Sequence, residues 1–511
     1  MQTFSQALQA LESYSPAEEH FNRRRRTVGL ALAPLAFVLL LVLPLPLPAP
    51  AHRLAAIFGL VVVLWMTEAL PVSVTALLGP ILAVVLRVAD ARTALAAFAD
   101  PIVFLFIGSF MLAQAMFVHG LDRRIAYTAL SSRFVGTHAT RVLLVYGGVA
   151  ASLSMWISNT ATTAMMFPIG LSIVGHLLRT AERDEESRRA VRRFAVGLML
   201  MTSFAASVAG MATPVGTPPN LIGLGMLERI LHVRIGFFQW MAMGVPLVLV
   251  LFAVLAAGLS WACARGVSIS AGSVDLVRQE MHKLGEMSIA QRNVLVAFGL
   301  TVSLWIAPGV FAIVGLDDTA LARGYAVAVP ESVAAMVGAI LLFVLPVDWR
   351  ARRFTLTWDE ASRIDWGIVL LYGGGLALGA LAFSTGLAHA IGRLATAWLP
   401  WQGTLALTAT FTAVAILLSE TTSNTASANM IVPVAIAVAQ AAGVRPIEPA
   451  LGATLGASMG FMMPISTAPN AIVYSSGFVP ITTMMRYGFW LDIAGFFAIV
   501  AVVMGAGRFL F

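Results

Sequence analysis

The chain alternates long apolar stretches with short polar ones, and most of the apolar stretches are long enough to cross a lipid bilayer. A helix needs roughly 20 apolar residues to cross about 30 Å of hydrocarbon. Eleven stretches approach this length, at 28–48, 54–70, 71–88, 101–119, 194–227, 236–264, 293–315, 331–347, 366–386, 450–477 and 488–509. The pattern predicts an all-α polytopic membrane protein with about 11 transmembrane helices.

Two further apolar stretches, 138–178 and 403–443, are too long for one span. Each is interrupted near its middle by a Ser-Asn-Thr triplet, at 158–160 and 423–425. Such a stretch can enter the membrane, turn at mid-depth and leave by the same side. Each is followed by a polar segment that contains proline, ATPVGTPPN in the first half and MPISTAPN in the second. Because proline breaks a helix, we expect two re-entrant hairpins and two broken helices.

These polar motifs occur twice in the same order. Ser158 and Ser423 are 265 positions apart, and Asn220 and Asn470 are 250 positions apart. A third match lies between IVFLFIGSFMLA, which starts at Ile102, and IVLLYGGGLALG, which starts at Ile368. A membrane chain that repeats itself in this way is typical of secondary transporters.

Arginine placement predicts that the two repeats have inverted topology. Basic residues concentrate on the cytoplasmic side of membrane proteins. The flanks of the first hairpin are rich in arginine, whereas those of the second contain only Arg445. The expected organisation is a cytoplasmic N-terminal segment (1–27), a first transmembrane helix (28–53), repeat 1 (54–264) with hairpin 138–178, a cytoplasmic linker (265–292) and repeat 2 (293–511) with hairpin 403–443.

Composition agrees with this organisation. Charged residues make up 11% of the chain, against about 25% in average soluble proteins, so no independent soluble domain is expected. The net charge of +7 comes from arginines between apolar stretches, which indicates topology rather than nucleic-acid binding. The run Arg23–Arg26 before the first span predicts a cytoplasmic N-terminus. The segments 122–135 and 387–398 mix polar and apolar residues and are expected to be amphipathic helices at the interface.

Two enzyme classes are disfavoured. Residues 456–460 fit the G-x-S-x-G pattern of serine hydrolases, but no histidine follows His389 to complete the usual order. The only lysine, Lys283, follows His282, so the phosphate-binding loop of an ATP-driven pump is missing. The single cysteine, Cys263, excludes an internal disulfide. We therefore expect a transporter with no organic cofactor, and not an enzyme.

Four backbone breaks inside a membrane predict a central cavity, because unpaired N–H and C=O groups are tolerated only where protein or water surrounds them. Carbonyl, serine and asparagine oxygens suit Na⁺, whereas helix N-termini, threonine hydroxyls and asparagine amides suit carboxylates. The four motifs contain no lysine or arginine. An anion there would be balanced by helix ends and bound cations, which favours coupled transport.

The paired Ser-Asn-Thr triplets with their GTPPN and STAPN breaks resemble the divalent anion/sodium symporter (DASS) family of di- and tricarboxylate carriers, along nearly the whole chain. The resemblance implies a lipid-embedded homodimer in a bacterial inner membrane. In such a dimer, a transport domain moves like an elevator against a scaffold domain. It also implies Na⁺ as the coupling ion.

Carried over by motif, the resemblance implies two sodium sites and one substrate site. The first sodium site would use Ser154, Ser158, Asn159 and Gly216, and the second Ser419, Thr422, Asn424 and Ser466. The dianion would contact Asn159, Thr160, Thr217, Pro218, Asn424, Thr425, Thr467 and Ala468. The halves differ where Ala468 replaces Pro218 and Ser466 replaces Gly216, and this leaves the substrate open.

The sequence therefore predicts Na⁺-coupled uptake of di- or tricarboxylates such as succinate, malate, fumarate or citrate. Three alternatives stay open at this point. A sodium-independent dicarboxylate exchanger and a sulfate transporter would share the fold, and a gated anion channel would use the same cavity differently.

Overall fold

The computed structural model describes residues 16–132, 134, 136, 138–181, 185–267, 271–398 and 403–509. These residues are mainly helical, and one short antiparallel pair, β1 (Pro346–Asp348) and β2 (Arg353–Phe354), joins two helices. The helices are α2 (Pro16–Val42), α3 (Ala49–Thr67), α4 (Val72–Val85), α5 (Ala91–Leu95), η1 (Ala96–Ala99), α6 (Pro101–Val118), α7 (Leu121–Leu130), α8 (Ala139–Ser154), α9 (Asn159–Thr180), α10 (Glu185–Ala209), η2 (Gly210–Ala212), α11 (Pro218–Leu231), α12 (Phe237–Cys263), α13 (Ala271–Lys283), α14 (Ile289–Ile313), α15 (Ala320–Ala328), α16 (Glu331–Val344), α17 (Trp358–Ala361), α18 (Trp366–Ser384), α19 (Leu387–Trp398), α20 (Thr404–Thr421), α21 (Asn424–Ala441), α22 (Ile447–Gly456), α23 (Ala468–Tyr474) and α24 (Ile481–Phe509).

Ten helices of the described chain are long and apolar enough to cross a membrane, or eleven if the bent pair α15–α16, with its 63° bend, is one span. This confirms the polytopic helical fold. Some of these spanning helices differ from the eleven spans expected from the sequence. The hairpin arms α9 and α20 reach spanning length, whereas α4 has only 14 residues, about 21 Å at 1.5 Å per residue.

The first two helices begin earlier than the hydrophobic pattern indicates. Helix α2 starts at Pro16 instead of 28, so Arg23–Arg26 lie within the helix and not before it. Arginine is a good helix former, which explains the continuity. Helix α3 starts at Ala49 instead of 54. The polar side chain of Arg53 does not end the span, because its Nη1 donates to the carbonyl of Leu86 at 3.0 Å.

Both predicted hairpins are present. Helices α8 and α9 are joined by residues 155–158, and the hydroxyl of Tyr146 in one arm donates to the Met166 carbonyl in the other at 2.6 Å. Ser158 caps α9 by accepting the Ala161 amide at 3.2 Å. In the second hairpin, Ser423 caps α21 by accepting the Ala426 amide at 3.3 Å. The serine of each triplet therefore starts a helix arm.

Both predicted breaks are present too, and each is fastened by an asparagine. The Nδ2 of Asn220 donates to the carbonyls of Gly210 (2.9 Å) and Thr213 (2.8 Å). The Nδ2 of Asn470 donates to those of Gly460 (3.0 Å) and Met463 (3.1 Å). The asparagine and both of its carbonyl partners are each 250 positions later in the second repeat than in the first. The two repeats therefore share individual hydrogen bonds as well as helices.

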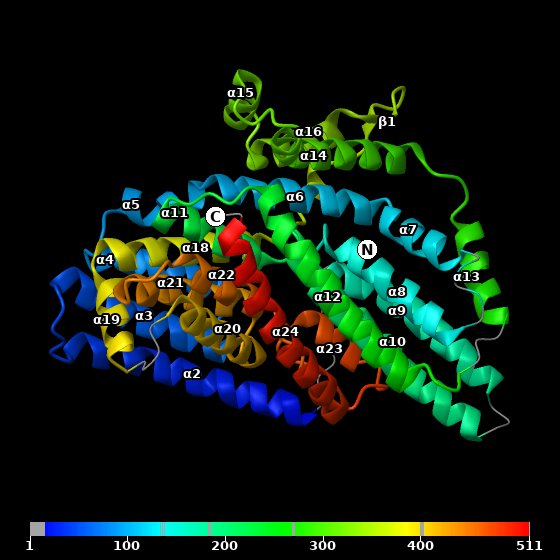
Figure 1. Ribbon diagram of the computed structural model, residues 1–511, viewed down its shortest axis with the longest axis horizontal. Coiled ribbons are helices and arrows are strands. Elements are labelled where there is room, and N and C mark those ends of the chain that lie inside the picture. The colour runs from blue at the N-terminus through cyan, green and yellow to red at the C-terminus, as the bar shows by residue number, and fades with distance from the viewer. Residues whose placement is uncertain are drawn as a thin grey trace.

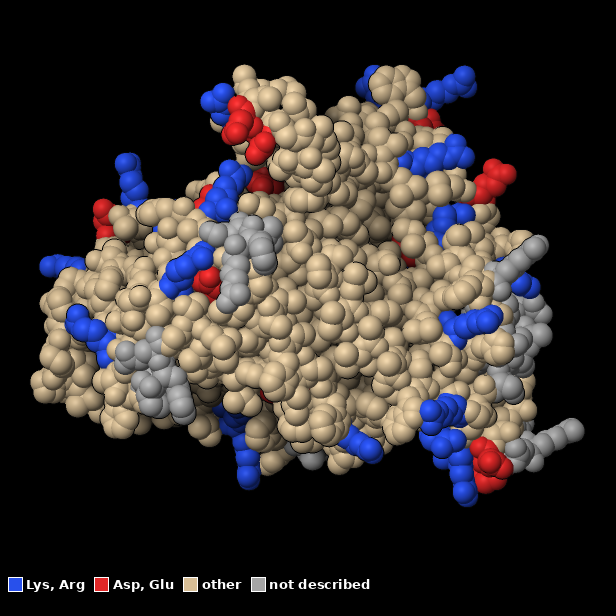
Figure 2. Space-filling view, in the orientation of Figure 1, with Lys and Arg blue, Asp and Glu red and all other residues tan. Residues whose placement is uncertain are grey.

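The core surrounds α10, which packs against α8, α9 and α12. Figure 1 shows α14, α15, α16 and β1 together along the upper edge, α2 along the lower edge, and α3, α4 and α19 on the left. Charged side chains lie mainly around the margins of the face in Figure 2, and its broad middle carries few of them. Large apolar side chains are well exposed elsewhere, as at Ile313 (73%) and Val327 (85%), as expected for surfaces in contact with lipid.

The predicted linker 265–292 is more structured than a plain connection. It contains α13, and the segment after this helix is fastened to α7 by Arg124. The guanidinium Nη2 of Arg124 donates to the carbonyls of Leu284, Gly285 and Glu286 at 2.9–3.0 Å, and its Nε donates to Gln291 Oε1 at 2.8 Å. The predicted amphipathic segments correspond to α7 and α19, although residues 133 and 135 of the first lie outside the described residues.

Candidate functional site

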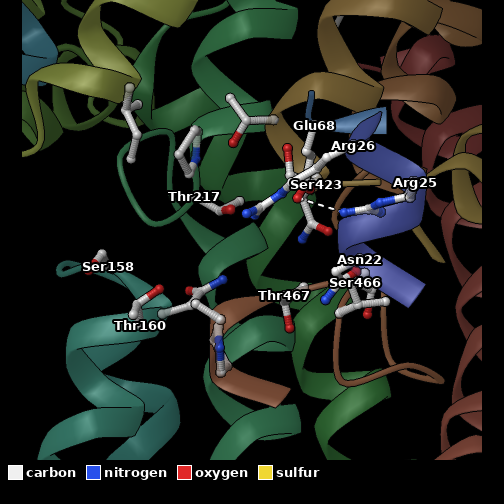
Figure 3. A pocket seen from close by; sticks show the side chains of 18 residues that line it. Asn22, Arg25, Arg26, Glu68, Ser158, Thr160, Thr217, Ser423, Ser466 and Thr467 are labelled. Atoms are coloured by element: carbon white, nitrogen blue, oxygen red, sulfur yellow. Dashed lines mark hydrogen bonds and ion pairs between the residues drawn. The ribbon is translucent and has the colours of Figure 1, made fainter. Parts of the chain in front are cut away.

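The tips of the two hairpins meet the two helix breaks around one cavity of about 270 Å³. Figure 3 shows Ser158 and Thr160 on one wall, Thr217 above them, and Ser466 and Thr467 on a different segment of the chain. The structure brings every residue predicted to contact the dianion to this cavity: Asn159, Thr160, Thr217, Pro218, Asn424, Thr425, Thr467 and Ala468. Their position is as expected, and their role as ligands stays a prediction.

Three helices of at least 14 residues begin at the cavity wall. Helix α9 starts at Asn159, α11 at Pro218 and α21 at Asn424, and these first residues line the cavity. The N-terminus of a helix carries free N–H groups and about half a positive charge. A small anion between the tips would therefore be stabilised without a lysine or arginine in the motifs.

A cluster of oxygen atoms lies behind the first hairpin tip. Ser154 Oγ donates to Asn159 Oδ1 at 2.7 Å. A Cβ atom added to Gly210 would lie 2.5 Å from Asn159 Oδ1 and 3.1 Å from the Gly216 carbonyl oxygen. A Cβ added to Gly216 would lie 2.5 Å from the Gly210 carbonyl oxygen and 3.0 Å from that of Met155. Glycine is thus needed at both positions, and uncharged oxygens of this kind suit a hard cation.

The second hairpin tip has an equivalent cluster. Ser419 Oγ lies 2.7 Å from Asn424 Oδ1 and 2.8 Å from the Ala457 carbonyl oxygen. A Cβ added to Gly460 would lie 3.0 Å from Asn424 Oδ1 and from both oxygens of Ser419. Ser466 Oγ donates to the Met463 carbonyl at 2.6 Å. The second cluster therefore contains a serine hydroxyl where the first has Gly216.

One predicted sodium ligand is placed differently. The hydroxyl of Thr422 donates to the carbonyl of Trp65 in α3 at 3.2 Å, and its side chain is buried there. Its side chain links the second hairpin to α3, and its role as a sodium ligand stays a prediction. Ser158 lines the cavity, but its Oγ is engaged in capping α9.

Residues 24–511 match the family described as "Sodium:sulfate symporter transmembrane region". The chain belongs to this family. A sodium-dependent dicarboxylate transporter SdcS from Staphylococcus saprophyticus is 33% identical over 446 residues, which cover 86% of this chain and 83% of the relative. SdcS from Staphylococcus aureus (strain USA300) is 32% identical over 448 residues, covering 86% and 82%. The family assignment confirms the resemblance to sodium-coupled anion carriers.

Two solved transporters share the fold of this family member at low identity. The Alcanivorax borkumensis YdaH transporter matches with a TM-score of 0.53 and 12% identity, covering 90% of this chain and 99% of that one. Neisseria gonorrhoeae MtrF, from a class of antimetabolite efflux pumps, matches with a TM-score of 0.52 and 13% identity, covering 90% and 95%. Family and fold together show an integral membrane transporter and not an enzyme.

Four further residues line the cavity and lie outside the Ser-Asn-Thr triplets and the proline-containing breaks. Asn22, Arg25 and Arg26 come from α2, and Glu68 follows α3. Figure 3 shows Arg25 joined to Glu68, and the Nη2–Oε2 distance is 2.8 Å. Arg25 and Arg26 are the basic groups of the wall, and Glu68 is its acidic group. The absence of proline between Pro16 and Pro34 was the available signal that α2 extends through the arginines.

A larger cavity of about 540 Å³ adjoins the first and shares Ser158, Thr160, Ile368 and Ala468 with it. Asp122 of α7 lies in its wall, almost fully buried, and neither carboxylate oxygen has a hydrogen-bond partner in the described chain. Burial raises the pKa of Asp122 to about 6, although the backbone amide and the positive charge of Arg123 act to lower it. Asp122 therefore titrates in the mildly acidic range beside the approach to the site.

We expect Asp122→Asn to stabilise the purified protein above pH 6 and to have little effect near pH 4. The folded-state pKa is raised, so the folded protein favours the protonated acid, and stability is lost as pH rises from about 4 to about 6. The shift of about two units corresponds to roughly 3 kcal/mol. Thermal unfolding at pH 4.5 and 7.5 measures this difference. An equal effect at both pH values would contradict the assignment.

Proposed function

We propose that the protein is a secondary transporter that uses the Na⁺ gradient to take up dicarboxylates such as succinate, malate or fumarate. The observation that carries the proposal is the single cavity bounded by both hairpin tips and both helix breaks, with an oxygen cluster behind each tip. The cavity suits a small anion, and the clusters suit cations. Similarity to proteins named sodium-dependent dicarboxylate transporters supports this choice of ions.

The charges around the cavity give a reason for coupling. Two arginines and one glutamate line it, which leaves one positive charge facing a dianion with two negative charges. An uncompensated charge in a partly buried site is costly. Sodium ions at the clusters, whose asparagines also line the cavity, would compensate the remaining charge. Each cation then increases the affinity for the anion, and the anion increases the affinity for each cation.

The proposal includes an elevator movement of a homodimer in a bacterial inner membrane, with the N-terminus in the cytoplasm. The cavity wall supports a movement between two groups of helices. One part of the wall comes from α2, the end of α3 and α18, and consists of Asn22, Arg25, Arg26, Glu68 and Ile368, whereas the rest comes from the hairpins and broken helices. A boundary that runs through the binding cavity allows one group to slide past the other with the anion bound.

Uptake of radiolabelled succinate into proteoliposomes tests the function directly. Accumulation into vesicles without internal substrate, only with an inward Na⁺ gradient, is the expected result. Uptake that requires internal dicarboxylate and ignores Na⁺ would show an exchanger and contradict the proposal. Non-saturating passive flux would show a channel. Transport of sulfate in place of succinate would reject the substrate class.

We expect Arg25→Gln to raise the succinate concentration for half-maximal uptake about tenfold, since a charge-assisted hydrogen bond contributes about 1.5–3 kcal/mol. The Na⁺ concentration for half-maximal uptake should change less than about twofold, because Arg25 lies in the cavity wall and not in an oxygen cluster. Arg24→Gln is the matched control, since Arg24 is on the same helix and does not line the cavity. Equal changes in both variants would show a nonspecific effect of charge.

A further inference from the structure

A further cavity, of about 640 Å³, lies where α9 ends and α10 and α24 begin, and it shares no lining residue with the transport cavity. We call it the arginine cavity, because four arginines line it: Arg179 of α9, and Arg188, Arg192 and Arg193 of α10. None of its lining residues in the described chain is acidic. Basic side chains gather at the lower right of Figure 2, where Figure 1 places the end of α9 and the start of α10. The transport scheme above does not use this positively charged wall.

The four guanidinium groups have little negative charge to balance them. Among the described residues only Arg188 contacts an acid, with its Nη1 3.9 Å from Glu185 Oε2. Arg179, Arg192 and Arg193 form no ion pair with the described part of the chain. Like charges around one space repel each other, whereas an anion in that space would be attracted by all four. Guanidinium groups bind phosphate especially well, because two parallel N–H groups match two of its oxygens. Phosphate is therefore the anion that this wall suits.

The opposite wall belongs to the second repeat and is mostly apolar. It comes from the connection between α23 and α24 and from the first turn of α24, and it consists of Gly477, Phe478, Pro480 and Thr483. Leu178 and Val196 add partly exposed apolar side chains on the arginine side. The first turn of α24 also has N–H groups without a helical partner, and these carry a partial positive charge. A ligand that fits this cavity therefore combines a negative group with an apolar part.

The position of the cavity along the membrane normal favours a lipid. It lies at the ends of three helices that are long and apolar enough to cross a membrane, Asn159–Thr180, Glu185–Ala212 and Ile481–Gly507. Lipid headgroups lie where spanning helices leave the hydrocarbon, and basic pockets between such helices bind the headgroups of anionic lipids. A soluble phosphate compound would leave the apolar wall uncovered. A phospholipid can place its phosphate at the arginines and its acyl chains on the apolar side chains.

Arginines in this position also set membrane topology, but that role does not require them to surround a cavity. Arg189 lies in the same flank, 3.5 Å from Glu185, and does not line the cavity. In the second repeat the corresponding connection, between α21 and α22, contains Arg445. Its Nη1 lies 3.1 Å from the Gly507 carbonyl oxygen and 3.4 Å from Glu448 Oε1. Within the described chain, the first repeat alone gathers arginines without acidic partners around a space at this point.

We propose that the arginine cavity binds the phosphate of an anionic phospholipid, whose acyl chains cover Phe478 and Val196. The bound lipid contacts α9 and α10 of the first repeat and the start of α24 in the second. It therefore holds the two repeats together at one surface of the membrane. Lipid binding does not depend on which anion or cation is transported, so the proposal goes beyond the function above and is tested without measuring transport.

Titration of the purified protein with phosphatidylglycerol in a neutral detergent tests the site, because a ligand of the folded state raises the unfolding midpoint. The rise should be saturable, and phosphatidylcholine, which has no net charge, should not cause it. Arg192→Gln should raise the lipid concentration for half-maximal effect about fivefold, and Arg179→Gln with Arg192→Gln about 25-fold, since each arginine attracts anionic lipid independently. Arg189→Gln is the matched control outside the cavity wall and should change this concentration less than about twofold. An equal effect of Arg189→Gln and Arg192→Gln, or an equal response to phosphatidylcholine, would overturn the proposal.

A second pair of variants separates the cavity from the charge around it. Thr483→Trp keeps all four arginines but fills the space with an indole ring, so saturable binding should be lost. Thr482→Trp, one position earlier and outside the lining, should retain it. Unchanged binding in Thr483→Trp would mean that lipid is attracted to an open charged surface, and this would overturn the proposal. Inorganic phosphate at about 10 mM should displace none of the lipid, because buried acyl chains supply much of a lipid's affinity. Complete displacement would identify a site for a soluble anion and would also overturn the proposal.

Discussion

Replacing Asn159 or Asn424 with alanine should reduce sodium-driven succinate uptake at least about 100-fold while leaving a folded protein. Each asparagine lines the cavity and places its Oδ1 in an oxygen cluster, 2.7 Å from a serine hydroxyl. Its loss removes a contact to the cation and one to the anion, and interactions with charged groups contribute about 1.5–3 kcal/mol each. Two such losses multiply to a 100-fold effect or more.

The control for this experiment is Asn293→Ala. Asn293 lies on α14 away from the cavity, and its Nδ2 donates to the Pro346 carbonyl (3.0 Å) and to Thr355 Oγ1 (2.8 Å). This variant also loses an asparagine with hydrogen bonds, but it should retain uptake and sodium affinity. Uptake measured per folded molecule, after size-exclusion chromatography, separates activity from stability. Full uptake in Asn159→Ala and Asn424→Ala would remove the basis of both predicted ion sites.

The parts of the site that were predictable share one property: they are polar interruptions of apolar stretches. Ser158 and Ser423 could be recognised as helix starts because a serine side chain can accept an amide at the first turn. The prolines at 218 and 469 marked the breaks, because proline is compatible with the first turn of a helix but not with its interior. Local chemistry therefore predicted both hairpins and both breaks, and the cost of unpaired backbone groups inside a membrane predicted that they border a cavity.

The contributions of α2, α3 and α24 depend on packing between distant segments. Arg25 reaches the cavity only because α2 packs on α3, whose following residue Glu68 holds the guanidinium. Helix α24 crosses the second break at Gly488, where an added Cβ would lie 2.5–2.6 Å from the backbone of Phe461 and Met462. Thr422 contacts Trp65 because α3 lies against the hairpin. Hydrophobic periodicity carries no information on which helices become neighbours, so these contacts could not be predicted from the sequence.

Asn470→Leu should weaken sodium binding more than tenfold and lower the stability of the folded protein by about 2–4 kcal/mol. Leucine is close to asparagine in size and carries no charge, but it has no N–H donor. The carbonyls of Gly460 and Met463 then lose their partner, and each unsatisfied buried group costs about 1–3 kcal/mol. Gly460, whose carbonyl accepts one of these hydrogen bonds, lies beside the second oxygen cluster. The positions of the oxygens in that cluster should therefore change together with the stability. Asn220→Leu should act in the same way through Gly210 at the first cluster.

Asn293→Leu separates the two effects, because it also removes two donated hydrogen bonds, but on a helix that does not line the cavity. Its stability should fall, whereas its sodium concentration for half-maximal uptake should stay within about twofold of the wild type. Thermal unfolding and sodium titration of uptake provide the two measurements. If Asn470→Leu loses stability while its sodium affinity is unchanged, the asparagine only holds the break closed. A joint loss, absent from Asn293→Leu, means that the hydrogen bonds that close each break also position the carbonyl oxygens of the proposed sodium sites.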